Sequence, residues 1–356
     1  MYFGCDHNLF FMKICIPRKR KMAHELLNHA SACRFTFTPA RVIGQGFFGI
    51  IQQGEWRVEM VGAPLSPPRS DGAVTVAIKT VQRRGQHAAS LIEKEMEVLR
   101  RLQNHSFTIN LLAVLQSTSA MHLVLQYCPG GDLFTFLASR INGDDARAAF
   151  LAHMMFFACE IVVALEYMHS RCIMHGDIKC ENILIDADGH IRLCDFGLSE
   201  VNVRRDSVGG PRGSELFISP EQMRGNMYGL AIDVWALGYV FINMFTYVNA
   251  KPHNMGDAIN VNVPLVRDTK VGMVAGMKEL IAQLLAVNPR DRPTMAQVKQ
   301  HAVFQGVDWT AVLSKTIPVP WRPPAEMSPT TFDDTFTTMP VFPIVQEDCV
   351  WVTLLD

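Results

Sequence analysis

Two short stretches decide the fold of this sequence. Residues 175–182 read His-Gly-Asp-Ile-Lys-Cys-Glu-Asn, and an Asp-Phe-Gly triplet begins at Asp195, eighteen residues after Asp177. Asp177 can orient and deprotonate a hydroxyl nucleophile, and Lys179 can neutralise charge on a transferred phosphoryl group. Asn182 and Asp195 supply oxygen ligands of the kind that magnesium prefers. Two acids and an amide in this order and spacing predict a phosphoryl-transfer site rather than a structural cluster.

A glycine motif lies upstream, Gly44-Gln45-Gly46-Phe47-Phe48-Gly49, inside a predicted strand–turn–strand segment from Phe35 to Ile51. Such glycines let backbone amides approach phosphates closely, because no side chains intervene. Dinucleotide-binding folds use the same motif, but at a strand-to-helix turn with an acidic residue about twenty positions on. Because that context is missing here, the sequence does not predict a dehydrogenase.

Lys79 ends an apolar stretch, Val76-Ala77-Ile78-Lys79. A buried lysine without a partner costs several kcal/mol, so an anionic partner is expected. Glu95 lies sixteen residues on, in a predicted amphipathic helix, and is preferred over Glu93 and Glu97. The alternative is an ordinary lysine whose aliphatic stem lies along apolar surface.

Composition and charge exclude several classes of protein. The chain has 356 residues, of which 49% are hydrophobic and 19% charged, so it is neither disordered nor fibrous. A net charge of -1 gives no basic field that would favour nucleic acid or an anionic membrane. The nine cysteines are scattered and form no Cys-x-x-Cys pair, which argues against a zinc site or disulfide framework and fits a reducing compartment.

The sequence also predicts the location of the chain. Glu160 interrupts the longest apolar run, from Met154 to Leu165, so we expect no membrane span. The positive charges near the N-terminus follow its short apolar patch instead of preceding it, unlike those of a secretory signal. The basic run Arg18-Lys19-Arg20-Lys21 fits either a nuclear address or a solvated segment. We expect an intracellular protein, cytoplasmic and/or nuclear.

Hydrophobic periodicity divides the chain into a strand-rich part and a helical part. Residues 62–72 are predicted to form a loop because Pro and Gly interrupt any strand there. The other predicted elements are strands over Val74 to Val81 and His122 to Tyr127, helices over about Ala88 to Leu102, Ala146 to Ser170, Ile232 to Val248 and Val271 to Val287, and a hairpin of Ile183 to Ile185 with Ile191 to Cys194.

Over about residues 36–305 the sequence resembles a eukaryotic protein kinase. The glycine motif, the Val-Ala-Ile-Lys strand, the catalytic loop and the Asp-Phe-Gly triplet occur in the family's order. Three further matches are Ser219-Pro220-Glu221, which closes the activation segment, Asp233 to Gly238 in a buried helix, and Arg292, which pairs with that glutamate in the family. Lys179, two residues after the catalytic Asp, is typical of serine/threonine kinases.

The resemblance implies a two-lobed α+β fold, with a small antiparallel-sheet lobe that carries one main helix and a larger, mainly helical lobe. The implied domains are an irregular segment over residues 1–34, a kinase domain over 35–304, and a tail over 305–356. The small lobe would span about 35–125, the hinge about 126–131 and the large lobe about 132–304. The tail, with Thr331-Phe332-Asp333-Asp334-Thr335-Phe336, resembles that of the AGC group, relatives of cyclic-nucleotide-dependent kinases, although its usual aromatic terminal motif is not evident.

By the same resemblance, ATP and Mg²⁺ are the expected substrate and cofactor, with Mn²⁺ as an alternative ion. Lys79 would hold the α- and β-phosphates and be oriented by Glu95, and Leu125 would be the gatekeeper. The residues expected to bind ATP are Ile43, Gly44, Gly46, Gly49, Ile51, Ala77, Lys79, Gln126, Cys128 and Leu184. Asp132 and Glu181 fall where relatives place acids that receive a basic residue upstream of the target serine, although an exposed acid is often merely solvated.

Two departures from the family pattern concern its regulation. Gly176 stands where the family usually has an arginine that meets a phosphate on the activation segment, and Gly210 stands where the AGC phosphorylation site would fall. Both halves of that ion pair are missing together, so the chain is either active without the phosphate or inactive. Ser207 is an off-register candidate for phosphorylation, and Ser214 replaces a threonine whose hydroxyl commonly bonds near the catalytic Asp and Lys.

The sequence therefore predicts a kinase that phosphorylates serine or threonine in a protein, with basic residues upstream of the target as one option. A pseudokinase that uses the same fold to bind nucleotide or a partner is the first alternative, motivated by Gly176 and Gly210. A small-molecule phosphotransferase is the second, and the full activation segment argues against it. The oligomeric state is left open.

Overall fold

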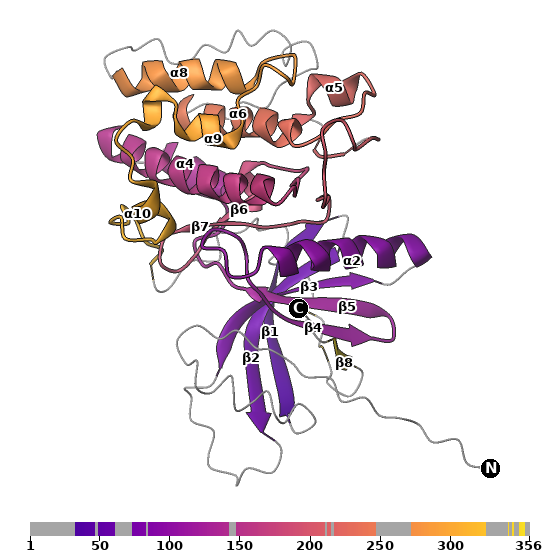
Figure 1. Cartoon of the computed structure of the whole chain (residues 1–356). Helices are drawn as coiled ribbons and strands as arrows, with labels where there is room; N and C mark the ends of the chain where they lie inside the picture. The colour runs from indigo at the N-terminus through magenta and orange to yellow at the C-terminus, as the bar shows by residue number, and fades with distance from the viewer. Residues whose placement is uncertain are drawn as a thin grey trace, which may run out of the picture. The chain divides into compact units, whose positions relative to one another are not determined.

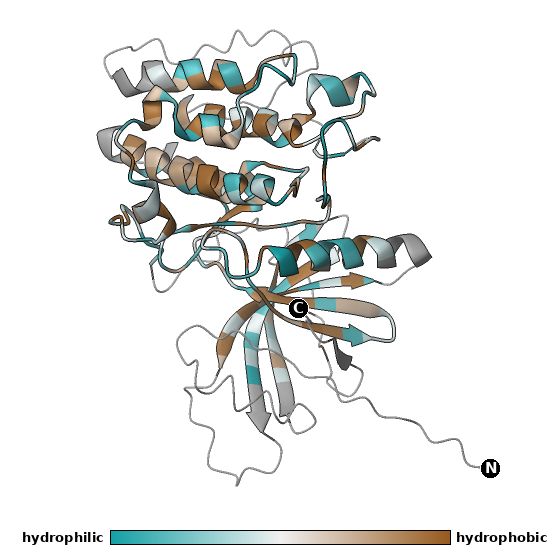
Figure 2. Cartoon of the chain, in the orientation of Figure 1, coloured by the Kyte–Doolittle hydropathy of each residue, from teal (hydrophilic) through white to brown (hydrophobic). Residues whose placement is uncertain are grey.

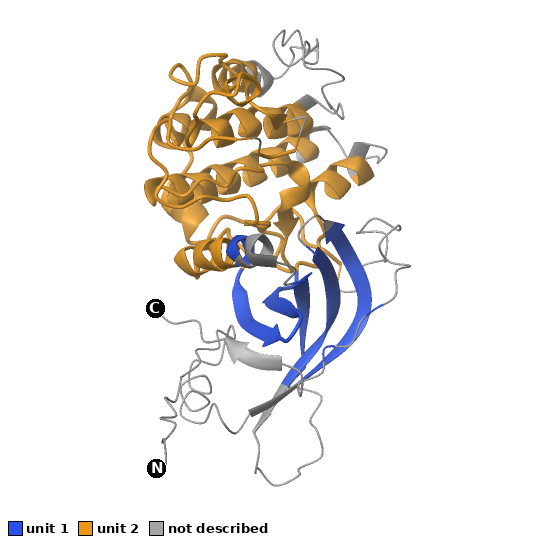
Figure 3. Cartoon of the chain, turned by 90° about the vertical axis from the view of Figure 1, so that its right-hand side faces the viewer, with its two compact units in different colours: residues 1–92, 110–127, 333–356 blue, residues 93–109, 128–332 orange. Residues whose placement is uncertain are grey.

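The computed structural model describes residues 33–46, 49–60, 73–82, 85–141, 147–210, 212–214, 217–246, 272–324, 341, 344 and 349–352. It divides into two compact units, coloured separately in Figure 3. Unit 1 comprises Met1–Ile92, Asn110–Tyr127 and Asp333–Asp356, and unit 2 comprises Glu93–Ile109 and Cys128–Phe332.

Unit 1 is built on a six-stranded antiparallel sheet (Figure 1) in the order β1-β2-β3-β5-β4-β8. The strands are β1 (Cys33–Gly46), β2 (Gly49–Met60), β3 (Val74–Gln82), β4 (Leu111–Ser117), β5 (Ala120–Gln126) and β8 (Cys349–Val352). Their β-branched and aromatic residues suit a pleated surface, and one face packs as a core. That core contains Phe37, Trp56, Val76, Ile78, Ala113, Leu115, Val124 and Ile344.

The end of the chain completes this sheet, which the sequence did not predict. Strand β8 pairs antiparallel with the edge strand β4, with Trp351 opposite Leu115. Ile344, just before β8, is 9% exposed within the same core as Phe37 and Trp56. The last part of the predicted tail is therefore a component of unit 1, and it covers an edge that would otherwise expose unpaired backbone groups.

Helix α2 (Gly85–Arg101) corresponds to the predicted charged helix and begins three residues earlier than expected. Of the residues that the apolar pattern predicted to be buried, Ile92, Val98 and Leu99 are buried and Leu91 is half-buried, and Met96 is buried as well. The predicted loop over residues 62–72 and the segment 1–32 lie outside the described residues.

Unit 2 is mainly helical. Its elements are α3 (Leu133–Ile141), α4 (Arg147–Ser170), the short strands β6 (Ile183–Ile185) and β7 (Ile191–Leu193), α5 (Pro220–Met223), α6 (Ala231–Thr246), α8 (Gly272–Leu284), α9 (Met295–Lys299) and α10 (Trp309–Leu313). Short 3-10 turns cover Cys180–Asn182 and Ala302–Phe304. The predicted long helices and the hairpin are confirmed, whereas α3, α5, α9, α10 and β4 of unit 1 were not predicted.

Helices α4 and α6 form much of the interior of unit 2, and both are largely hydrophobic (Figure 2). Within the described residues, Phe150–Ser170 of α4 has the length and the mean hydropathy, 1.6, that a membrane crossing would need. Glu160 therefore does not exclude such a helix by composition, contrary to the sequence expectation. Because 72% of that window is buried inside the protein, α4 has the character of a core helix.

A buried ion pair joins two distant segments of unit 2. The guanidinium of Arg292 donates to both carboxylate oxygens of Glu221 at 2.7 Å, and also to the carbonyls of Ala231 and Ala286. This bidentate geometry satisfies both charges, as a buried pair requires. The structure thus confirms the pairing that the family resemblance implied, and it fixes the start of α5 beside the start of α6.

We predict that Ile344→Ala destabilises unit 1, because it removes a buried side chain that links the end of the chain to the sheet core. The expected loss in the free energy of unfolding is about 2–4 kcal/mol. Val341→Ala is the control, since Val341 is 37% exposed and its truncation should cost less than about 0.5 kcal/mol. Urea unfolding of the full chain measures both, and equal effects would show that the end of the chain does not contribute to the core.

Candidate active site

Asp177 is surrounded by donors from two segments of unit 2, the catalytic loop itself and the segment that carries Ser214. Its Oδ1 accepts from the backbone N–H and the hydroxyl of Ser214, each at 2.9 Å. Its Oδ2 lies 2.9 Å from the Lys179 ammonium and accepts from the Asn182 amide at 3.0 Å. The Ser214 hydroxyl also accepts from Lys179 at 2.8 Å. Both carboxylate oxygens are therefore held in fixed directions, and Ser214 takes the role that the sequence suggested for it.

The catalytic loop itself is held by Asp233 at the start of α6. One carboxylate oxygen accepts from the backbone N–H of His175 at 2.8 Å and from the His169 ring at 2.9 Å. The other accepts from the backbone N–H of Gly176 at 2.9 Å. The sequence placed Asp233 in a family signature but did not predict this role.

Burial would raise the pKa of Asp233, but its bonds to His169 and its proximity to His175 outweigh that effect and hold the pKa below the ordinary 3.8. A depressed pKa means that Asp233 contributes stability above pH 3.8, and that this contribution is lost as the pH falls through its folded-state pKa. The catalytic loop is therefore tied to a carboxylate that stays charged at neutral pH.

The ring of His175 points inward and is also fully bonded. Its Nδ1 accepts from the backbone N–H of Asp177 at 3.3 Å, and its Nε2 lies 3.1 Å from the carbonyl of Cys194. A neutral ring with the proton on Nε2 satisfies both contacts. The ring packs against Phe196, with 5.2 Å between the centroids. His175 thus links the catalytic loop to the segment that carries Asp195.

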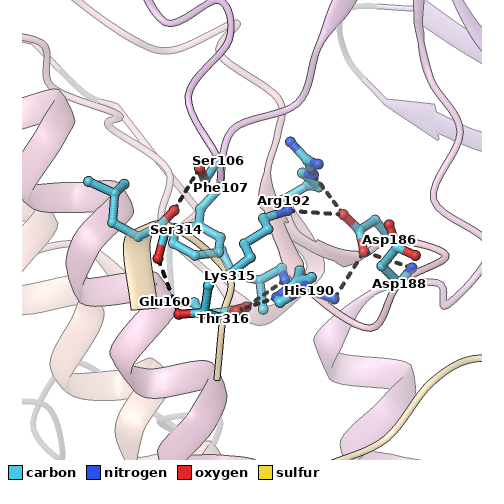
Figure 4. Close-up of polar contacts among 12 residues, drawn as sticks. Ser106, Phe107, Glu160, Asp186, Asp188, His190, Arg192, Ser314, Lys315 and Thr316 are labelled. Atoms are coloured by element: carbon cyan, nitrogen blue, oxygen red, sulfur yellow. Dashed lines mark hydrogen bonds and ion pairs between the residues drawn. The ribbon is translucent and has the colours of Figure 1, made fainter. Parts of the chain in front are cut away.

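Asn182 and Asp195 flank the β6–β7 hairpin, which a polar network fixes in place (Figure 4). The Asp186 carboxylate accepts from the backbone N–H of His190 and from Arg192, each at 3.0 Å, and so braces the turn. The His190 ring lies 2.5 Å from Glu160 of α4, and the Lys315 ammonium lies 3.5 Å from Asp186. The hairpin is thus held from α4 and from the segment after α10.

This supporting network was not predicted from the sequence. Burial raises the pKa of Glu160 in spite of its bond to His190, and burial lowers the pKa of Lys315. The one signal of it in the sequence was Glu160, an acid inside the apolar stretch of α4, since a buried carboxylate requires a partner. Because of this network, the two candidate magnesium ligands, Asn182 and Asp195, are presented by a rigid hairpin rather than by a free loop.

The donors of the candidate magnesium site fit that ion. The Asn182 amide nitrogen donates to the Asp177 carbonyl at 2.7 Å as well as to its carboxylate, which leaves the amide oxygen for another partner. Asp195 has φ 59, in the left-handed region that costs about 1–2 kcal/mol for a non-glycine residue. Such strain persists where the surroundings fix a side chain for a function. Magnesium is commonly bound by one or two such protein ligands together with substrate phosphates.

In unit 1 the strand register brings predicted ATP-binding residues together. Gly44 lies opposite Ile51, Ile51 opposite Lys79, and Lys79 opposite Leu123. Ala77 lies two residues from Lys79 and therefore on the same face of the sheet. Four of the predicted residues thus share one face of the sheet.

The glycine motif departs from the regular strands in two places. Ile43 lies at a register shift between Val42 and Gly44. Gly49 has φ 144, and a Cβ there would lie 2.1 Å from the Thr80 carbonyl oxygen, so only glycine fits this position. Gly46 ends β1, and Phe47 and Phe48 are outside the described residues.

Lys79 and Glu95 are both buried, at 5% and 3% exposed. Lys79 belongs to unit 1 and Glu95 to unit 2, so their pairing stays a prediction. Gln126 is tied within unit 1, where its backbone N–H and its side-chain oxygen both bond to Asn110. In unit 2, Cys128 is buried, which raises the pKa of its thiol to about 12, and Leu184 is half-buried on β6.

The two predicted substrate-binding acids differ in their surroundings. Asp132 accepts from the backbone N–H of Thr135 at 2.8 Å and from its hydroxyl at 3.0 Å, which caps the start of α3. Burial raises the pKa of Asp132, and the nearby charge of Glu181 adds to that effect. Glu181 is exposed. The structure therefore gives Asp132 a helix-capping role that the sequence analysis did not anticipate.

Gly176 and Gly210 have nearly the same backbone but different surroundings. Their φ angles are 80 and 84, both in the region that favours glycine. A Cβ at Gly176 would lie 2.6 Å from the Leu198 carbonyl oxygen and 3.0 Å from Cδ of Arg212, whereas a Cβ at Gly210 would meet nothing within 4 Å. The space beside the catalytic loop at Gly176 is therefore already occupied.

These surroundings predict that a substitution by alanine lowers the free energy of unfolding by different amounts at Gly210 and Gly176. Gly210→Ala should cost about 1–2 kcal/mol from backbone strain alone. Gly176→Ala should cost about 1–3 kcal/mol more, because the new methyl group overlaps the Leu198 carbonyl. Thermal unfolding of the two variants measures the difference, and equal shifts in Tm would contradict it.

Comparison with known proteins shows which family the chain matches and which proteins it is similar to. The family described as protein kinase domain matches residues 67–304. Ribosomal protein S6 kinase alpha-4 of Mus musculus is 32% identical over 268 residues, which is 70% of this chain and 33% of that protein. Protein kinase C-like 1 of Caenorhabditis elegans is 31% identical over 258 residues, 68% of this chain and 35% of that protein. The chain spans about a third of the length of these curated relatives.

The matched range contains the catalytic loop, the Asp-Phe-Gly triplet and Lys79, and both relatives are kinases by name. The two-unit α+β architecture agrees with this match. The chain belongs to the protein kinase family.

Proposed function

We propose that this chain transfers the γ-phosphoryl group of ATP to a serine or threonine hydroxyl of a protein, without needing a phosphate on its activation segment. The arrangement around Asp177 carries the proposal. A carboxylate held by Ser214, Lys179 and Asn182 can accept a hydrogen bond from the substrate hydroxyl in a fixed direction and take its proton.

Lys179 supports the same step from the other side. Its ammonium contacts both the Asp177 carboxylate and the Ser214 hydroxyl, so it lies where the transferred group would meet the nucleophile. A fixed cation there would stabilise negative charge on that group during transfer. Phosphoryl transfer requires little covalent chemistry from the protein, so the protein contributes positioning and charge stabilisation.

Asn182 and Asp195 are the residues that would hold Mg²⁺, with Mn²⁺ as an alternative. When bound, the ion would offset negative charge on the phosphates. In unit 1, the shared face of Gly44, Ile51, Ala77 and Lys79 supports a role in binding ATP. Gln126, Cys128 and Leu184 complete the proposed adenine site, and Glu95 is the proposed partner of Lys79.

The substrate class is a protein or peptide, as it is for the kinase family. Glu181 is exposed and offers a charge for a basic residue of the substrate, whereas Asp132 is engaged at the start of α3. The kinase domain is proposed to span residues 35–304, with a tail from 305 whose end joins unit 1. We place the protein inside the cell, in the cytoplasm, the nucleus or both.

The first test is transfer of labelled γ-phosphate from Mg-ATP to a basic serine peptide. Wild type should be active, and Asp195→Asn should lose at least about a hundredfold in kcat, because it removes a charged magnesium ligand. Asp188→Asn, the same change at an exposed position of the β6–β7 turn, should stay within about twofold. No transfer by wild type to peptide or generic protein substrates, with Mg²⁺ or Mn²⁺, would favour the pseudokinase alternative.

The second test concerns the phosphate. Phosphatase treatment of the purified protein should leave its specific activity within about twofold, because Gly176 supplies no cation for an activation-segment phosphate. Mass spectrometry of residues 198–214 verifies that no phosphate remains, Ser207 included. A drop of tenfold or more would contradict independence from phosphorylation.

A further inference from the structure

Arg212 occupies the space that Gly176 leaves open on the catalytic loop. Its Cδ lies 3.0 Å from the place where a Gly176 side chain would begin. The side chain of Arg212 is 17% exposed, so most of it lies within the protein. An arginine from the activation segment therefore fills a position beside residues 175–177 where the loop itself contributes none.

The guanidinium of Arg212 joins two acceptors on another part of the activation segment. Its Nη1 donates to the Leu198 carbonyl at 2.5 Å, and its Nη2 donates to the Glu200 carboxylate at 2.9 Å. The planar group presents two donors in one fixed geometry, which a lysine ammonium does not reproduce. Arg212 thus connects the segment after Asp-Phe-Gly with the segment before Ser214.

The acceptor segment is itself bonded to the catalytic loop. The backbone of Glu200 exchanges two hydrogen bonds with Met174, at 2.9 and 3.0 Å. The Ser199 hydroxyl donates to the His175 carbonyl at 2.9 Å. The bonds of Arg212 to Leu198 and Glu200 therefore also connect it to Met174 and His175, at the start of the catalytic loop.

On its other side Arg212 is two residues from Ser214. Its carbonyl accepts from the Gln222 amide at 3.0 Å, which fixes the backbone at this point. Gly213 follows with φ 92, and a Cβ there would lie 3.0 Å from the Gly176 carbonyl oxygen. Ser214 then donates to Asp177 from both its N–H and its hydroxyl. A shift of Arg212 would therefore be transmitted directly to Asp177.

Lys94 of α2 adds a second cation to the same carboxylate. Its ammonium donates to Oε1 of Glu200 at 2.8 Å, and this is the oxygen that also accepts from Arg212. Burial would raise the pKa of Glu200, but the two donors outweigh that effect and lower it. Glu200 therefore remains charged at neutral pH between two cations.

We propose that Arg212 is a positioning residue for Asp177. With Glu200, Lys94 and the Leu198 carbonyl it forms what we call the ionic clasp. This clasp holds the activation segment against the catalytic loop in place of a phosphate. The role in turnover rests on the proposed kinase function, whereas the role in holding the segment does not.

The experiment compares Arg212→Ala, Arg212→Lys and Arg204→Ala in the full chain. Arg204 is an exposed arginine of the same segment and is the matched control. Arg212→Ala should lower kcat at least tenfold and leave the KM for ATP within twofold, because the clasp acts on Asp177. Arg212→Lys keeps the charge and one donor and should recover part of the loss, and Arg204→Ala should match wild type.

Hydrogen–deuterium exchange gives a readout that needs no activity. In Arg212→Ala, amides of residues 198–200 and 212–214 should exchange at least tenfold faster, while those of α6 keep the wild-type rate. Glu200→Gln should produce the same local pattern more weakly. If wild type were inactive, the proposed function would fail, and this exchange pattern would still decide whether the clasp exists.

Two results would overturn the inference. The first is an Arg212→Ala variant whose kcat stays within twofold of an active wild type, or whose exchange over 198–214 is unchanged. The second is faster exchange that extends through α6, or a loss that Arg212→Lys does not reduce at all. The first result would show that Arg212 does not position Asp177, and the second would make Arg212 an ordinary contributor to overall stability.

Discussion

The catalytic loop of unit 2 depends on the hydrogen bonds that it donates to the carboxylate of Asp233. This carboxylate is buried at the start of α6, and it accepts hydrogen bonds from two successive backbone amides of the catalytic loop and from the His169 ring. A carboxylate in such a place must be satisfied by donors, or its burial would cost several kcal/mol. The loop, in turn, obtains a fixed backbone from a helix that belongs to the interior, so Asp177 starts from a defined position.

From that fixed loop, polar contacts extend in two directions. One runs through the His175 ring to the Cys194 carbonyl, and so to Asp195 and the braced β6–β7 hairpin. The other runs from Asp177 to Ser214, Arg212 and Glu200. Both paths consist of short hydrogen bonds between side chains and backbone, which restrict direction as well as distance. The proposed chemistry, which relies on positioning, matches a site constructed in this way.

Much of the fold and the candidate site could be predicted because the relevant signals are local. The order and spacing of Asp177, Asn182 and Asp195 are visible in the chain, and long apolar periodicity marks α4 and α6. Strand β4 escaped prediction because Leu111–Ser117 is a short apolar run, which periodicity cannot distinguish from other buried segments. Strand β8 escaped because Cys349–Val352 becomes a strand only through pairing with β4, more than two hundred residues away.

The sequence by itself determined which chemical groups this protein carries and in what order, including the absence of an arginine at Gly176. It did not determine what fills the space beside that glycine. Only the tertiary structure places Arg212 there, thirty-six residues along the chain, and gives Glu200 two cations. The physical reason is that an ion pair depends on distance in space, and the chain's spacing fixes that distance only within a helix, a strand or a tight turn.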